Sequence, residues 1–188
     1  MHGIEYIYRT SMDKRMNNMY PSICKILKRT YTTNGNNNNV RQQIFNALEK
    51  QKGNVFTREF IVDETKSTTF VKPIDIYSTP AMIWDMEWFT RDIILDTIND
   101  VVVATDYEEN LDSVGTNVVF KHTAATPIGE TVFIETKIIH IDEAKSKIET
   151  ETIISDSLGI LGKGKHERAI VDMNMINQRV QDRKDKLK

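Results

Sequence analysis

The sequence contains few of the residues from which metal centres, disulfide frameworks and membrane spans are built. One cysteine, Cys24, excludes an internal disulfide and a cysteine-rich zinc site, and the four histidines are scattered without ligand-like spacing. No apolar run reaches the ~20 residues that a membrane-spanning helix needs. Glycine-rich nucleotide motifs and the G-x-S-x-G nucleophile motif are absent as well. We therefore expect no metal, no bound cofactor and no membrane insertion.

The remaining composition is that of one ordinary globular domain. Hydrophobic residues make up 39% and charged residues 28% of the 188-residue chain, which is enough to form a single core. The formal net charge is -2, so the balance of charge over the whole chain does not favour a nucleic-acid partner.

Residues 1–39 differ in composition from the rest of the chain. Residues 1–31 carry six basic and two acidic side chains, a net charge of +4, which is typical of a mitochondrial transit peptide. The stretch 28–32 (KRTYT) also resembles a matrix-protease cleavage site, whereas the polar tract 34–39 (NGNNNN) is typical of a disordered linker. An unstructured basic tail without a targeting role is the alternative. We predict a location in the mitochondrial matrix or, if the tail carries no address, in the cytoplasm.

Hydrophobic periodicity divides the rest of the chain into helices and strands. Residues 40–53 are predicted to form a short helix, because Val40, Ile44, Phe45 and Leu48 recur at helical spacing. The other predicted elements are β-rich segments at 55–62 and 67–71, a helix from Pro80 to about Ile98, a polar loop at 105–112, strands at 114–122, 131–141, 147–156 and 164–173, and a charged C-terminal tail at 176–188 that is either a solvated helix or disordered.

The order of these elements predicts an α+β fold in which an antiparallel β-sheet wraps around one long helix. Four β-rich runs joined by short polar or glycine-bearing connections are typical of a meander. The sheet needs an apolar layer on its inner face, and the helix that begins near Pro80, with Thr79 as its expected N-cap, is the only candidate. Its first turns are apolar on nearly every side, which predicts burial on most faces. This arrangement is the hotdog fold, and we assign it to residues 54–175.

Three segments of the chain resemble the fluoroacetyl-CoA thioesterase family, whose members have the hotdog fold. They are 78–89 (STPAMIWDMEWF), 113–130 (SVGTNVVFKHTAATPIGE) and 162–172 (GKGKHERAIVD). The HTAATP-G stretch, preceded by SVGT, is the most specific part. The resemblance covers roughly residues 55–175 and has no counterpart for the N-terminal part of the chain.

The resemblance implies a catalytic set of Thr79, Glu87 and His122, with Gly115 as a further residue of the substrate-binding site. The eight-residue step from Thr79 to Glu87 and the place of His122 at the head of HTAATP both agree with the family pattern. It also implies an acyl-CoA substrate and a homodimer whose sheets pair edge to edge, with CoA present only as part of the substrate. Specificity for a fluoroacetyl group is not implied, because residues 90–112 show no match to the lid on which that specificity depends.

The residues themselves support this chemistry, although each also has a simpler interpretation. Glu87 lies inside an apolar run, where a carboxylate loses hydration and is suited to act as a general base on water or as a nucleophile. A solvent-facing helix residue is the simpler reading. His122 has the alternative of a hydrogen-bonded core histidine. Thr79 offers a hydroxyl beside the free N–H groups of a helix start, which suit a developing oxyanion, or serves only as a cap.

Neighbouring residues are interpreted structurally. Strand alternation places His122 on one face with Val114, Thr116, Val118 and Phe120. Asp85 points about 200° away from Glu87 on the helix and is expected to be partly solvated or paired with a base. Gly162 and Gly164 are expected to permit a bulge or a close backbone approach. His140 and His166 have no context comparable to that of His122.

We therefore predict a thioesterase that hydrolyses a short- or medium-chain acyl-CoA to the free acid and CoA. Glu87 activates water or attacks the carbonyl, His122 assists proton transfer, and Thr79 orients the reacting groups. A non-catalytic acyl-CoA-binding hotdog module is the first alternative, which an intact catalytic set disfavours. The second is an enoyl-CoA hydratase, whose Asp-x4-His arrangement has no match because residues 75–100 contain no histidine.

Overall fold

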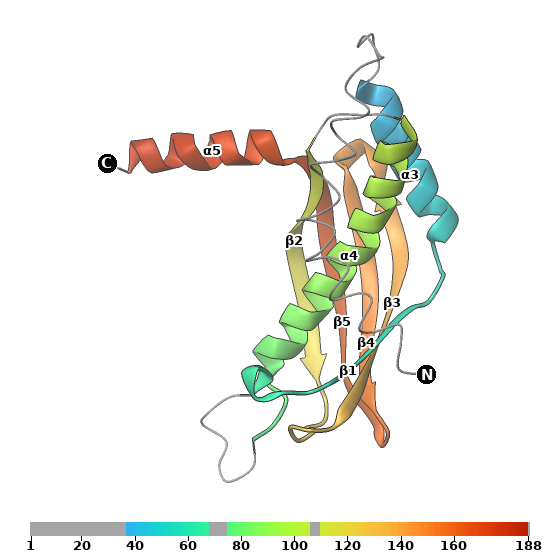
Figure 1. The fold of residues 1–188 in the computed structure, drawn as a ribbon, viewed down its shortest axis with the longest axis vertical. Coiled ribbons are helices and arrows are strands. Elements are labelled where there is room, and N and C mark those ends of the chain that lie inside the picture. The colour runs from blue at the N-terminus through green and yellow to red at the C-terminus, as the bar shows by residue number, and fades with distance from the viewer. Residues whose placement is uncertain (1–36, 68–74, 106–109, 188) are drawn as a thin grey trace, which may run out of the picture. The chain divides into compact units, whose positions relative to one another are not determined.

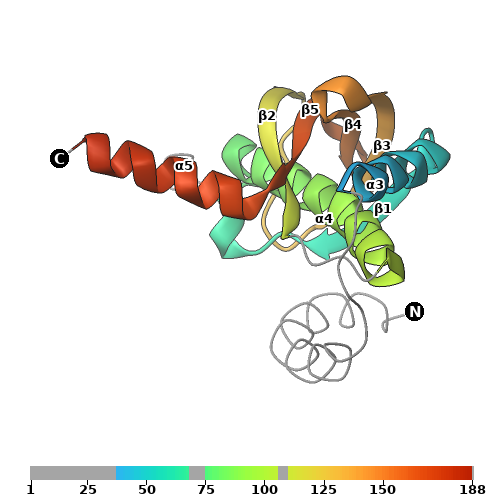
Figure 2. The same ribbon diagram turned by 90° about the horizontal axis from the view of Figure 1, so that it is seen from above.

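One antiparallel sheet contains all five strands of the computed structural model, which describes residues 37–67, 75–105 and 110–187. The strands are β1 (Phe56–Ile61), β2 (Leu111–His122), β3 (Thr131–Asp142), β4 (Lys147–Asp156) and β5 (Gly159–Asp172), in the spatial order β1-β3-β4-β5-β2. The sheet curves around one long helix, α4 (Thr79–Thr105), as Figure 1 and Figure 2 show. The predicted α+β architecture is confirmed.

Helix α4 buries one stripe of side chains against the inner face of the sheet. The stripe includes Met82, Met86, Phe89, Ile93, Ile94 and Ile98, which recur three or four residues apart. It meets alternate residues of β3 and β4, namely Val132, Ile134, Ile138, Ile148 and Ile154, which are all buried. Each large apolar side chain buried in this way contributes about 1.5–3 kcal/mol to stability. Because Val101 and Val102 also pack on the core, α4 continues beyond the predicted end at Ile98.

The expectation that α4 is buried on most faces is wrong for its outer side. Trp84 is 60% exposed and Trp88 is 42% exposed in the single chain. The two rings lie side by side, with their centroids 5.8 Å apart. A pair of exposed tryptophans on the central helix is therefore available to another surface.

The start of α4 is capped by Ser78 and not, as predicted, by Thr79. The hydroxyl of Ser78 accepts a hydrogen bond from the amide of Ala81 at 3.3 Å, and its carbonyl accepts from the amide of Met82 at 2.9 Å. Thr79 is the first helical residue. Because Ser78 satisfies the helix end, the hydroxyl of Thr79 is released for another partner.

Helix α3 (Asn37–Gln51) belongs to the core of the domain. Val40, Ile44, Phe45 and Leu48 are buried in the same cluster as the inner residues of α4 and the sheet. The helix begins at Asn37, so the predicted linker at 34–39 is too long, and its first three residues lie outside the described residues. The predicted leader at 1–31 also lies outside them.

The connection between β2 and β3 corrects the predicted meander. Only β3, β4 and β5 follow one another as neighbours, whereas β2 pairs with β5 at the far side of the sheet. Residues 123–130 make the crossing, and they hydrogen-bond to Tyr77 and Asp75 just before α4. This route brings the end of β2 to the start of α4.

A β-bulge in β2 corrects the predicted strand faces. The register with β5 shifts between Gly115 and Asn117, so Thr116 is an extra residue with no opposite partner. Ser113 is therefore buried on the inner side, and the hydroxyl of Thr116 bonds to Glu167. Gly115, and not its neighbours, faces α4.

The expected close approach at Gly162 and Gly164 is confirmed. A Cβ on Gly162 would lie 2.4 Å from the ring of Phe120, and one on Gly164 would lie 2.7 Å from the same ring and 2.8 Å from the sulfur of Met86. The two glycines therefore make room for Phe120 between β5 and α4.

Helix α5 (Met173–Lys186) forms the C-terminal tail and extends past the edge strand β2, away from the sheet (Figure 1). Its first residues follow β5 directly, and none of its residues is buried. The solvated helix is therefore the correct one of the two predicted states. Among the described residues, no helix has the length and apolarity needed to span a bilayer.

Candidate active site

Thr79 and His122 form a hydrogen-bonded pair where β2 ends beneath the start of α4. The hydroxyl oxygen of Thr79 lies 2.6 Å from Nδ1 of His122. The other ring nitrogen, Nε2, lies 2.7 Å from the carbonyl oxygen of Ala124. The structure therefore brings together two of the three predicted catalytic residues.

The protonation of the pair follows from its partners. A carbonyl only accepts hydrogen bonds, so Nε2 of His122 carries a proton and donates it to Ala124. In the neutral ring Nδ1 then accepts from the hydroxyl of Thr79. This order of hydroxyl, imidazole and carbonyl orients His122 as a base toward Thr79.

Glu87, the third predicted residue, lies in a second cluster on the same helix. Its Oε1 would be 2.6 Å from a Cβ on Gly115, so the carboxylate lies directly over that glycine. Oε1 is also 3.6 Å from Nη1 of Arg168 and 3.9 Å from Nε2 of His166. The side chain is 42% exposed. The carboxylate is therefore less desolvated in the single chain than expected, and its neighbours within that chain are Arg168 and a histidine other than His122.

The two clusters are far apart within a single chain. Thr79 and Glu87 are separated by eight residues, which is about 12 Å along a helix. On the sheet, His122 is opposite Gly162 and Gly115 is opposite Arg168, six residues further along β5, which is about 20 Å. Glu87 and His122 of one chain therefore cannot contact the same small group.

Arg168 holds the second cluster together, and the sequence reasoning missed it. Its guanidinium donates to the hydroxyl of Ser113 at 2.9 Å, to the carbonyl of Ser113 at 2.5 Å and to the carbonyl of Glu87 at 3.3 Å. Burial lowers the pKa of Arg168, but the hydrogen bonds and the facing carboxylate compensate a buried cation. Arg168 thus ties β2 and α4 to β5.

His166 was also missed. Its side chain is fully buried, and among the described residues neither ring nitrogen has a hydrogen-bond partner. Burial, and then the positive charge of Arg168, lower the pKa of His166 to about 4, so the ring is neutral near pH 7. Alternation had offered a signal, because His166 and Arg168 share their parity with the buried residues Gly162, Gly164 and Ile170.

Asp85 is paired with a base, as one of its two predicted states required. Its carboxylate accepts from Nζ of Lys66 at 2.5 Å and from the hydroxyl of Tyr77 at 2.6 Å. Burial and the Asp85 carboxylate raise the pKa of the Tyr77 hydroxyl. Asp85 therefore anchors the segment before α4 and does not compete with Glu87.

A shallow hollow of about 190 Å³ opens beside Glu87 on the surface of α4. It is lined by Trp84, Glu87, Trp88, Arg91 and Arg168. The guanidinium of Arg91 lies 5.3 Å from the ring centre of Trp88 and pairs with Asp112. The second cluster is thus accessible from the side on which the tryptophans are exposed.

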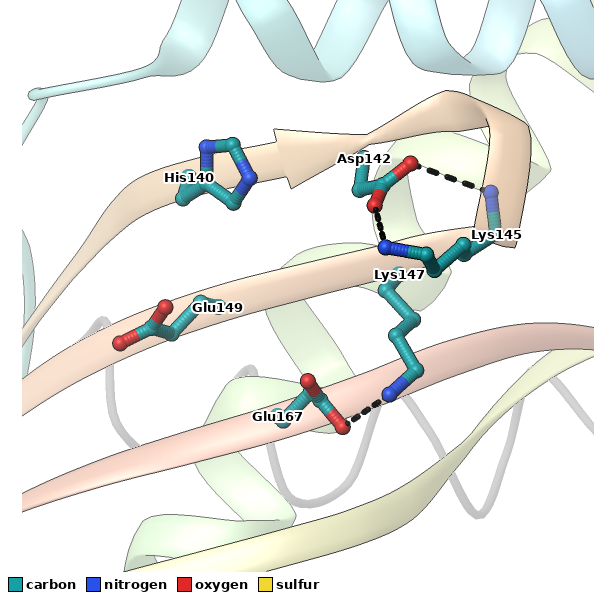
Figure 3. Close-up of a pocket in the computed structure, with 6 residues that line it drawn as sticks. All are labelled: His140, Asp142, Lys145, Lys147, Glu149 and Glu167. Atoms are coloured by element: carbon teal, nitrogen blue, oxygen red, sulfur yellow. Dashed lines mark hydrogen bonds and ion pairs between the residues drawn. The ribbon is translucent and has the colours of Figure 1, made fainter.

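A second hollow, of about 210 Å³, lies on the outer face of the sheet and is shown in Figure 3. Its charges are largely paired: Lys147 contacts Glu167 at 2.7 Å, and Lys145 contacts Asp142 at 2.9 Å. These contacts lower the pKa of both carboxyl groups. The hollow therefore offers surface ion pairs, which contribute little to stability, and not a reactive group. Within the described part of the chain, no group of three metal-ligating side chains gathers there or elsewhere.

Comparisons with known proteins identify the family to which the chain is similar. The profile of the family described as fluoroacetyl-CoA-specific thioesterase matches residues 57–174. The fluoroacetyl-CoA thioesterase of Streptantibioticus cattleyicolor is 25% identical over 139 residues, which are 70% of this chain and 92% of the relative.

Solved structures are similar as well. A variant of the fluoroacetyl-CoA-specific thioesterase in complex with fluoroacetate and CoA has a TM-score of 0.54 at 25% identity, covering 66% of this chain and 98% of that chain. A hot-dog-like protein from Thermanaerovibrio acidaminovorans has a TM-score of 0.59 at 18% identity, covering 70% and 91%. The latter likeness is one of fold, and it confirms the hotdog assignment.

We predict that His166 makes folding sensitive to acid. The unfolded ring takes up a proton near its ordinary pKa of 6.5, whereas the buried ring does so only at about pH 4. Stability is therefore retained above pH 6.5 and lost as the pH falls toward 4, by about 2 kcal/mol between pH 7.5 and 5. Urea unfolding at the two pH values measures the loss, which His166→Gln should abolish and the surface variant His140→Gln should leave in place. An equal loss in wild type and His166→Gln would contradict the assignment.

Proposed function

The chain belongs to the fluoroacetyl-CoA-specific thioesterase family and is an acyl-CoA thioesterase, and we propose that it hydrolyses a short- or medium-chain acyl-CoA to the free acid and CoA. The observation that carries the proposal is the 2.6 Å contact between Thr79 and His122, with Glu87 on the same helix. These are the three positions that matched the family pattern.

Each cluster supplies a different part of the reaction. Glu87 takes a proton from water while the water oxygen bonds to the thioester carbonyl carbon. As the C–S bond breaks, its electron pair leaves with the sulfur of CoA, which takes up the proton that Glu87 received, relayed by the Thr79 hydroxyl that is hydrogen-bonded to His122, so that Glu87 returns to the carboxylate. Attack by Glu87 itself, giving a mixed anhydride that water then cleaves, leads to the same products.

The complete site is proposed to form in a homodimer. Because Glu87 is about 12 Å from Thr79 along α4, one protomer cannot bring both groups to one carbonyl. We propose that Thr79 and His122 of one protomer act together with Glu87 of its partner. A two-fold dimer would contain two such composite sites.

Three features of the surface support this dimer. Strand β2 is an edge of the sheet, and an unpaired strand edge favours pairing with a second chain. Trp84 and Trp88 are exposed next to Glu87, and aromatic residues of this kind are enriched in interfaces. Helix α5 extends past β2, where a chain paired on that edge would lie against it (Figure 1).

The carbonyl is proposed to be polarised by backbone amides near Gly115. At the helix start, the amides of Ala81 and Met82 already donate to Ser78, and Pro80 has no N–H. Thr116 is the extra residue of the bulge, and we propose that its backbone amide binds the oxyanion.

The size of the acyl group is proposed to be limited by Phe120. Its ring fills the space between β5 and Met86, because Gly162 and Gly164 admit it there. An acyl chain that enters beside Glu87 would meet His166 and then Phe120. This arrangement favours short acyl groups over long ones.

Replacement of Glu87 by Gln should lower kcat for the best substrate of an acyl-CoA panel by about 10²–10⁴-fold, because the amide cannot accept the proton of water. Release of free CoA thiol measures the rate. Asp100→Asn, a change of an exposed acid on the same helix, is the matched control and should retain full activity. Tight acyl-CoA binding by a wild type without turnover would instead indicate a non-catalytic binding module.

Two inactive variants should complement each other if the site is shared between protomers. The double variant Thr79→Val/His122→Gln retains Glu87, and Glu87→Gln retains the Thr79–His122 pair. Co-expression should give mixed dimers with one intact site each, so a random mixture recovers about a quarter of wild-type activity. Each variant alone stays inactive. A mixture as inactive as its components would place the whole site within one protomer.

Residues 1–31 are proposed to direct the protein to the mitochondrial matrix, on their basic composition. A fluorescent protein fused after residue 39 should enter mitochondria, and a version with its six basic residues changed to Gln should not. Cytoplasmic fluorescence from both fusions would refute the proposed address.

A further inference from the structure

His166 combines complete burial with two unsatisfied ring nitrogens. Its side chain is 0% exposed, and neither nitrogen has a hydrogen-bond partner among the described residues. Leaving a buried polar group unpaired destabilises the folded state, and native proteins contain few such groups. A nonpolar residue at this position of β5 would avoid the cost, so the ring calls for a functional explanation.

The ring is aimed at the carboxylate that the proposed reaction uses. Nε2 of His166 lies 3.9 Å from Oε1 of Glu87, too far for a direct hydrogen bond. One oxygen atom can bridge two such atoms with hydrogen bonds of about 2.8 Å to each. The burial of the ring also keeps it neutral, because its pKa is lowered to about 4.

Gly115 permits the close approach of Glu87 and His166 over the edge strand. A Cβ at this position would lie 2.6 Å from Oε1 of Glu87 and 2.9 Å from Nε2 of His166, so any other residue would crowd both atoms. Gly115 is exposed and lies at the bulge of the edge strand. The notch bounded by Gly115, Glu87 and His166 therefore borders solvent at Gly115 and at Glu87, whose side chain is 42% exposed, whereas the ring nitrogens of His166 are closed to solvent in the single chain.

We propose that this notch holds the hydrolytic water, with His166 as the residue that positions it. The inference rests on the proposed thioester hydrolysis and adds a role for His166 to it. Nε2–H donates to the water oxygen, and one water hydrogen points to Glu87. The second lone pair of the oxygen remains free to attack the thioester carbon.

The step balances without any additional reactant. Glu87 receives one proton of the water, the O–H group becomes part of the acid, and the C–S electron pair leaves with the sulfur of CoA. His166 keeps its proton throughout, because it serves as a donor and not as a base. In the tautomer with the proton on Nε2, Nδ1 carries a lone pair. An acceptor of this kind is less costly to leave unpaired than an N–H group.

A comparison of His166→Gln with His166→Leu tests the proposal. Leu removes the donor and should lower kcat by about 10²-fold, with KM changed less than about threefold. Gln keeps an N–H group and should recover at least a tenth of wild-type kcat. Gly115→Ala, which fills the notch, should lower kcat in the same way as Leu. Circular dichroism checks that each variant is folded, and His140→Gln serves as the surface control.

A second measurement separates water positioning from a structural role. With hydroxylamine present, acyl groups are divided between free acid and hydroxamate, and His166→Leu should raise the ratio of hydroxamate to acid at least about fivefold. An unchanged ratio, or a Gln variant as slow as Leu, would overturn the role of His166. In that case wild-type turnover and its loss in Glu87→Gln would still stand. A wild type that cleaves no thioester would refute the proposed function itself.

Discussion

The close packing of α4 across β5 is the constraint on which the rest of the structure depends. Most of the sheet presents aliphatic side chains to this helix, but β5 presents Gly162, Gly164, His166 and Arg168. The glycines allow Phe120 and Met86 to fill the space above them. The two polar residues that follow lie beneath Glu87. One strand thus changes from a packing surface to a polar surface within a few residues.

The polar residues His166 and Arg168 of β5 are buried although burial of polar groups is unfavourable. Arg168 compensates its burial with three hydrogen bonds to Ser113 and Glu87, whereas His166 has no such compensation among the described residues. A core built only for stability would place an apolar residue at both positions. Arg168 therefore holds the cluster together, whereas the ring of His166 remains available for another partner.

Much of the fold and part of the site were predictable from the sequence. The helix, the strands and the Thr79–His122 pair follow from local pattern and from three short segments. The place of β2 beside β5 was not predictable, because the length of 123–130 permits either a hairpin or a crossing. The bulge at Gly115 is one extra residue and leaves no mark on composition.

The polar residues of β5 were missed for a related reason. His166 and Arg168 stand between Lys165 and Glu167, so the segment resembles an exposed charged strand unless its alternation is followed through to Ile170. Glu87 was singled out from the sequence, but its neighbours in the structure, His166 and Arg168, were not. Which histidine it meets depends on how far along β5 the helix crosses, and no local pattern encodes that distance.

The bulge also determines which residues of β2 face α4. Before Thr116 the odd-numbered residues of β2 face the helix, and after it the even-numbered residues do. Insertion or deletion of one residue between Gly115 and His122 would exchange the two faces of part of the strand, so that either Gly115 or His122 would point away from the helix. Insertion or deletion of two residues would leave both facing the helix. The number of residues in this strand can therefore change only in steps of two if both Gly115 and His122 are to keep facing the helix.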